Sequence, residues 1–110
     1  MDYLWEHFVL NELHAELQVR DIRYWRDKRG HEIDFVLIQR GNAPIVVECK
    51  WSASEFDASG LKAFRLAYLK GENFVVVRDV DRPSIRHYGD VSTVFVSLQN
   101  LIQKIKPQPL

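Results

Sequence analysis

Hydrophobic and polar positions alternate along this chain with two different periods. From residue 2 to about residue 18, polar side chains recur at helical spacing among apolar ones, and residues 59–70 and 98–105 repeat the helical pattern. Stretches rich in β-branched and aromatic residues predict strands at residues 22–27, 31–40, 45–51, 74–80 and 91–97. The pattern therefore predicts a helix, three strands, a helix, two strands and a helix.

The connections between these elements predict how the strands pair. Gly41 to Pro44 supply the residues expected of a short loop, which is typical of an antiparallel hairpin. A helix separates the strands at 45–51 and 74–80, so that pair is expected to be parallel. The expected fold is α/β, a central mixed sheet of 4–5 strands flanked by helices, in a single domain over residues 1–110 whose residues 106–110 are a frayed tail.

Three charged residues lie on the second and third predicted strands. Asp34 precedes Glu48 by fourteen residues, and Lys50 follows two residues after Glu48. Because side chains alternate along a strand, Asp34 is expected to share a face with Glu32, and Glu48 with Lys50. The opposite face is expected to carry Ile33, Phe35, Leu37, Val47, Cys49 and Trp51. A hairpin register that sets Asp34 beside Glu48 would bring two carboxylates and one ammonium group together.

Two converging carboxylates admit two interpretations. They repel each other unless a cation neutralises them, and Mg²⁺ accepts one or two carboxylates while water and phosphate complete its coordination. Zinc would need closely spaced histidine or thiolate ligands, which the four histidines do not offer. Alternatively, Asp34 or Glu48 pairs with Lys50 on a solvated face of the sheet. Glu32 is likewise a second ligand, a hydrogen-bond acceptor beside the ligands, or the partner of Lys28 or Arg29 across the turn.

These residues carry a resemblance to a known family. Asp34 followed by Glu48-Cys49-Lys50 resembles the signature of the PD-(D/E)XK nuclease superfamily. The stretches WEHFVLNEL (residues 5–13), YWRDK (24–28) and EIDFV (32–36), in this order, resemble the C-terminal domain of unknown function of a prokaryotic AAA-type ATPase family. That domain is regarded as nuclease-like. The resemblance covers roughly residues 1–100, and the ATPase part is absent from this sequence.

The resemblance implies a restriction-endonuclease-like core and a metal-dependent phosphodiesterase that hydrolyses nucleic acid, with DNA as the expected substrate. Asp34 and Glu48 match the ligands of Mg²⁺ (or Mn²⁺) in the superfamily. Lys50 matches the lysine that orients the attacking water or stabilises charge on the scissile phosphate.

Two helices contribute weaker candidates. The superfamily often adds an acidic residue from the first helix, and the matching position here is Glu6, which is implied as a further catalytic residue and metal ligand. The helical pattern alone equally supports an interaction of Glu6 with the helix dipole. Related nucleases often place a basic residue on the helix after the third strand, which makes Lys62, or Arg65, a candidate for contact with phosphate.

Composition restricts the partners of the chain. Fifteen basic and fifteen acidic residues give a formal net charge of zero, which argues against tight nucleic-acid binding by the chain alone. The sequence has no Gly-x-x-x-x-Gly-Lys-[Ser/Thr] loop, so ATP hydrolysis is not assigned to it, and an ATPase domain or subunit is an expected partner. The alternative function is a catalytically silent nuclease-like module that binds nucleic acid or protein beside an ATPase.

Two further expectations concern assembly and location. A homodimer would extend the small surface of the chain. The single cysteine, Cys49, and the lack of any apolar run of ~18 residues predict a cytoplasmic protein without membrane contact.

Overall fold

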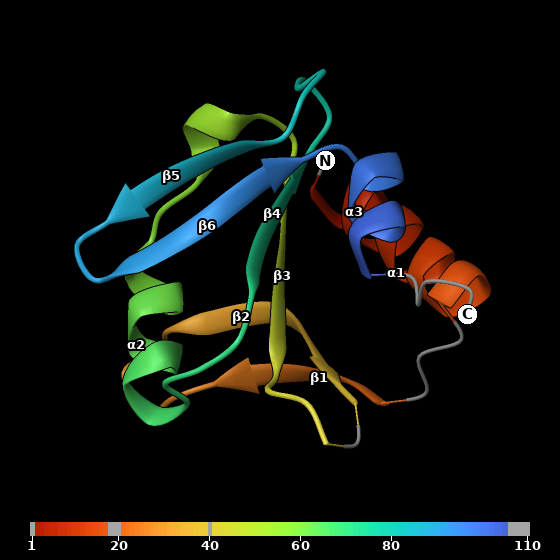
Figure 1. Cartoon of the computed structure of the whole chain (residues 1–110). Coiled ribbons are helices and arrows are strands. Elements are labelled where there is room, and N and C mark those ends of the chain that lie inside the picture. Colours follow the sequence, from red (N-terminus) through yellow and green to blue (C-terminus); the bar gives the residue numbers. More distant parts are fainter. Residues whose placement is uncertain (1, 18–20, 40, 106–110) are drawn as a thin grey trace.

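The computed structural model describes residues 2–17, 21–39 and 41–105 (Figure 1). The predicted element ends at residues 18 and 40 and the predicted tail at 106–110 lie outside these described residues. In chain order the elements are α1 (Asp2–Leu17), β1 (Asp21–Arg26), β2 (Glu32–Ile38), β3 (Ile45–Lys50), the short 3-10 helix η1 (Ala53–Glu55), α2 (Ser59–Ala67), β4 (Asn73–Val77), β5 (Ser84–Tyr88), β6 (Val91–Val96) and α3 (Leu98–Ile105).

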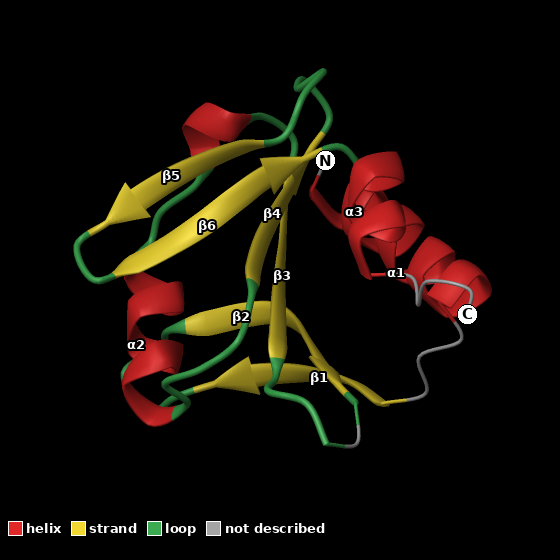
Figure 2. Cartoon of the chain, in the orientation of Figure 1, coloured by secondary structure: helices red, strands yellow, loops and turns green. Residues whose placement is uncertain are grey.

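The strands form one mixed sheet in the order β1-β2-β3-β4-β6-β5. Strand β2 pairs antiparallel with both β1 and β3, and the β2–β3 pairing is the hairpin predicted from the loop at Gly41 to Pro44. Strand β4 is parallel to β3 and to β6, and β5 closes the far edge antiparallel to β6. Helices α1 and α3 cover one face of the sheet and α2 covers the other (Figure 2). The described part of the chain is thus an α/β domain with six strands and three α-helices.

Each face of the sheet has its own apolar core. Under α1 and α3, side chains from the helices meet those of β2, β3, β4 and β6; the buried members include Val9, Leu13, Phe35, Leu37, Val47, Phe74, Val76, Val96 and Leu101. Under α2, a smaller cluster comprises Ile33, Val36, Val46, Leu61 and Phe64. Strands β3 and β4 carry apolar residues on both faces because both faces are covered, and Glu48 and Lys50 at the end of β3 are the charged exceptions.

The sixth strand corrects the expected sheet of 4–5 strands. Strand β5 reads Ser84-Ile85-Arg86-His87-Tyr88, and all but its last residue are exposed. It is an edge strand that pairs only with β6, and only its last residue, Tyr88, is half-buried, against the cluster of Val75, Val77 and Phe95. It thus carries no period-two alternation of apolar and polar residues. Its sequence therefore has the composition of a loop.

Helix α2 ends at Ala67, three residues before the predicted end, because Arg65 holds the following chain in an extended conformation. The guanidinium group is buried and donates to the backbone oxygens of Pro44, Tyr68, Lys70 and Glu72 and to Oδ1 of Asn73; these five donor–acceptor distances lie between 2.7 and 3.2 Å. Arg65 is therefore a structural residue, and the expectation that it contacts phosphate is wrong.

Candidate functional site

Strand β2 carries a β-bulge at Asp34. Between the residues that pair on either side, β2 contributes two residues, Asp34 and Phe35, where β1 contributes only Tyr24. A bulge of this kind bends the strand and redirects one side chain. Asp34 is thus displaced from simple alternation at the point where β2 approaches β3.

The bulge also explains a wrong prediction about the faces of β2. Phe35 and Leu37 lie in the core under α1, as alternation predicts. Ile33, which was expected to share their face, lies instead with Val36 in the core under α2. One extra residue between Ile33 and Val36 shifts the alternation, so the two residues face the same way.

Beyond the bulge, side-chain carboxylates take the place of the β2–β3 ladder. The paired residues of these strands end at Phe35 and Val47. Further along, the Asp34 N–H donates to Oε1 of Glu48 at 3.0 Å, and the Cys49 N–H donates to Oδ2 of Asp34 at 2.8 Å. The two reciprocal hydrogen bonds hold the Asp34 and Glu48 side chains between the parting strands. The structure therefore brings the two predicted carboxylates together.

The environment of Glu48 disfavours its charge. The residue is 8% exposed, and its pKa is raised from 4.5 to about 8, first by burial and then by the negative charge of Asp34. The hydrogen bond from the Asp34 backbone and the positive charge of Lys50 lower this pKa, whereas Glu6 raises it. A cation bound at this site would stabilise the ionised form of Glu48 and so lower its pKa, against the effects of burial and of the Asp34 charge.

Lys50 and Glu6 border the carboxylate pair from two elements. Lys50 is half-buried at the end of β3, and Glu6 is half-buried in α1, whose first turns lie beside the ends of β3 and β4 (Figure 1). Glu6 acts on the pKa of Glu48 and also on that of Cys49, so its charge is sensed on β3. Burial is the main cause that raises the pKa of the Cys49 thiol, which makes this cysteine a packing residue.

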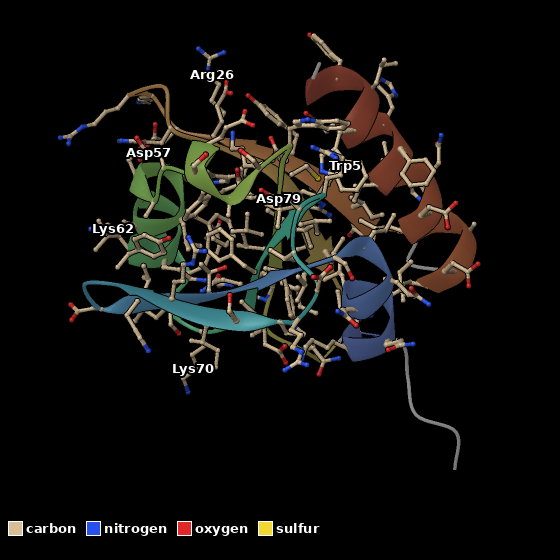
Figure 3. All side chains as sticks on the ribbon, turned by 90° about the horizontal axis from the view of Figure 1, so that it is seen from above. Trp5, Arg26, Asp57, Lys62, Lys70 and Asp79 are labelled. Carbon is tan, nitrogen blue, oxygen red and sulfur yellow. The ribbon has the colours of Figure 1, made fainter. Side chains whose placement is uncertain are left out.

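The two supporting candidates lie outside this group. Glu32 is exposed and lies 3.9 Å from Arg26 on the paired strand. Lys62 projects from the outer side of α2 in Figure 3 and lines an open hollow of about 470 Å³ with Tyr88 and Asp90. Neither contact is with Asp34 or Glu48, and the basic residue that Glu32 approaches is Arg26 rather than the expected Lys28 or Arg29.

Sequence reasoning missed Tyr24, the residue opposite the bulge. Its ring is 58% exposed, and its pKa is raised mainly by a hydrogen bond to Glu32, with a smaller contribution from the charge of Asp34. An exposed aromatic residue on an edge strand next to charged positions is the signal in the sequence that marks it.

The pair of carboxylates fits a hard divalent cation. Across residues 2–17, 21–39 and 41–105, no three side chains of His, Cys, Asp or Glu are grouped so that they could hold one ion. Mg²⁺ needs only one or two carboxylates, whereas zinc takes several nitrogen or sulfur ligands. A carboxylate has about four lone-pair sites, so a hydrogen bond to one oxygen leaves Asp34 and Glu48 capacity as ligands.

A comparison with protein families adds an independent observation. The family model described as "Domain of unknown function (DUF4143)" matches residues 2–100. The chain belongs to this family. The match is consistent with the resemblance to a C-terminal, ATPase-associated domain, and the matched span contains Glu6, Asp34, Glu48 and Lys50. The comparisons with curated proteins and with solved structures each gave no match.

For this DUF4143 domain, the description of the family assigns no activity, so the function has to be argued from the site. Among the helices of the described residues, none has the length and apolar character needed to cross a membrane.

Proposed function

We propose that this domain is a metal-dependent phosphodiesterase of the PD-(D/E)XK type that hydrolyses DNA. The observation that carries the proposal is the pair of reciprocal hydrogen bonds by which Asp34 and Glu48 are held together between parting strands, with Lys50 at the end of the same strand. Burial and the charge of Asp34 raise the pKa of Glu48, and a bound cation would favour its ionised form, so a functional cation is consistent with this arrangement.

In this proposal the acidic residues bind the cation and the lysine acts on the water or the phosphate. Asp34 and Glu48 would hold Mg²⁺ or Mn²⁺, and Glu6 adds negative charge from α1. When bound, the cation lowers the pKa of its water and neutralises charge on a phosphate. Lys50 supplies an ammonium group that can orient the attacking water or stabilise the charge that develops on the phosphate oxygens. Burial of Glu48 keeps competing water away and strengthens these electrostatic interactions.

The fold and the charge of the chain support the same proposal. A mixed sheet in which an antiparallel hairpin leads into a parallel β3–β4 pair, with helices on both faces, is compatible with a restriction-endonuclease-like core. The zero net charge points to a partner that supplies further contacts with DNA. An ATPase domain or subunit, or a second copy of the chain, would provide that surface.

The experiment is a cleavage assay with purified chain, supercoiled plasmid and single-stranded and duplex oligonucleotides, in Mg²⁺, Mn²⁺ or EDTA. We expect metal-dependent cleavage that Asp34→Asn, Glu48→Gln and Lys50→Met abolish and that Glu55→Gln, an exposed control in η1, preserves. Thermal melting in the same buffers should show a rise with metal in the wild type and none in the Asp34→Asn, Glu48→Gln double variant.

The absence of both cleavage and metal binding would contradict the proposal. If wild-type protein shows neither cleavage nor a metal-dependent rise in melting temperature, the phosphodiesterase proposal fails. The silent binding module then becomes the better description of the domain.

A further inference from the structure

A cluster of aromatic rings and one arginine adjoins the candidate site. We call Trp5, Phe8, Trp51 and Arg78 the aromatic cluster. Trp51 immediately follows Lys50, and Trp5 lies in the same turn of α1 as Glu6. The start of α1 lies beside the ends of β3 and β4 in Figure 1, and Trp5 points toward the sheet in Figure 3. The cluster and the carboxylate pair therefore share one end of the sheet.

The cluster is held in a fixed arrangement. The indole N–H of Trp5 donates to the backbone oxygen of Val76 at 3.3 Å, and the Trp5 ring meets Trp51 edge-on at a centroid distance of 6.2 Å. The guanidinium carbon of Arg78 lies 4.2 Å from the centre of the Trp51 ring. The backbone N–H of Arg78 also donates to the backbone oxygen of Trp51, at 3.3 Å. Phe8 stacks on Trp5 at 5.9 Å. Rings held in this way lose little freedom when a ligand binds.

The same rings remain accessible. Trp51 is 40% exposed and Phe8 is 52% exposed, and Arg78 is exposed as well. Exposed aromatic rings grouped with an exposed arginine are typical of a binding surface rather than of a core.

Along the backbone, Trp51 is two residues beyond Cys49, whose N–H donates to Asp34. Two residues of a strand span about 7 Å. The Trp51 ring lies with Trp5 on the α1 face of the sheet, whereas alternation places Glu48 and Lys50 toward the α2 face, so the cluster and the site meet at the end of β3.

We infer that the aromatic cluster stacks unpaired bases of single-stranded DNA next to the scissile phosphate. This inference rests on the proposed nuclease function. Proteins that bind single strands combine aromatic rings, on which bases stack, with arginine and lysine that accompany the backbone. In a duplex the base faces are already stacked on one another, so these rings would favour a single strand or an opened end.

The neutral charge of the chain agrees with this kind of ligand. Duplex binding depends on many phosphate contacts, which a chain with equal numbers of acidic and basic residues supplies poorly. Stacking, in contrast, adds affinity without adding charge. A domain that uses Trp51 and Arg78 needs few further cations to hold one or two nucleotides at the site.

The test measures binding apart from cleavage, in an Asp34→Asn background with EDTA. Anisotropy of a labelled oligo(dT) of about 12 nucleotides gives the affinity, and a duplex of the same length is the comparison. We expect tighter binding of the single strand, a loss of roughly 5- to 100-fold with Trp51→Ala, and recovery with Trp51→Phe, which keeps a ring. Tyr68→Ala removes an aromatic residue on the opposite face of the sheet, 48% exposed, and should leave the affinity unchanged.

Several results would overturn the inference. These are equal affinity for duplex and single strand, wild-type affinity in Trp51→Ala, or a change in oligomeric state in place of a change in DNA affinity, since the last identifies a protein interface. The two proposals also fail separately. Single-strand binding by a protein that never cleaves DNA refutes only the nuclease proposal, whereas metal-dependent cleavage that Trp51→Ala leaves intact refutes only the role of the aromatic cluster.

Discussion

Replacing Glu48 by glutamine should stabilise the metal-free domain in a pH-dependent way. In the unfolded chain this carboxyl ionises near pH 4.5, but in the folded domain its pKa is about 8 because of burial and the charge of Asp34. Between these two values the unfolded state loses a proton that the folded state retains. Stability of the wild type should therefore fall as pH rises from about 4.5 and level off above about 8.

The structure sets the size of this effect. One pKa unit corresponds to ~1.4 kcal/mol, so the full shift of Glu48 corresponds to a penalty on the order of 5 kcal/mol above pH 8. Glutamine retains an oxygen to accept the Asp34 N–H, but its buried amide group introduces a desolvation cost of ~1–3 kcal/mol. The net gain of Glu48→Gln should be roughly 2–4 kcal/mol at alkaline pH. Near pH 5 the electrostatic penalty has nearly vanished while the desolvation cost remains, so the variant should there be no more stable than the wild type, or less stable.

Thermal and urea unfolding between pH 5 and pH 9, in EDTA, measure this difference. For a domain of about 100 residues, each kcal/mol shifts the melting temperature by ~4–8 °C, so the expected change is easily resolved. A difference between variant and wild type that stays constant over the whole pH range would refute the reasoning, because the penalty would then not be electrostatic. A wild type that gains stability above pH 7 would refute it as well.

Two further predictions concern the scaffold that holds the site. Arg65→Met leaves four backbone oxygens without their buried donor and should destabilise the domain by about 3 kcal/mol or more in urea unfolding. Lys62→Met, an exposed control on the same helix, should change the unfolding free energy little. Similar values for the two variants would contradict the structural role of Arg65. Gly60→Ala places a Cβ 2.5 Å from the backbone oxygen of Glu32 and should lower the free energy of unfolding by ~1–3 kcal/mol. Leu66→Ala, at an 83% exposed position of the same helix, is the neutral control. An unchanged melting temperature in Gly60→Ala would show that α2 does not pack tightly against β2.

Much of the architecture follows from the sequence because it depends on local signals. The hairpin loop before Pro44 and the helix between β3 and β4 are enough to predict one antiparallel and one parallel pair. The convergence of Asp34 and Glu48 follows from the same register. The single-domain boundary, the catalytic and metal-binding roles and the partners stay predictions.

Other features depend on interactions that no local pattern records. The bulge at Asp34 arises from the way β2 meets both neighbours at once, and the residues around it are ordinary strand residues. The early end of α2 depends on Arg65 reaching loops that are distant in the sequence, including Pro44. Strand β5 exists because β6 offers it a partner, since its own side chains bury almost nothing.

The parallel pairing of β3 with β4 has a consequence for how the domain matures. Glu6, Asp34, Glu48 and Lys50 all belong to the first fifty residues, yet β3 becomes an interior strand only when β4 has paired with it. Until then, one edge of the strand that carries Glu48 and Lys50 is unpaired and open to water. During synthesis from the N-terminus, the fixed and buried arrangement of the carboxylates should therefore form late, after the second half of the chain has been made.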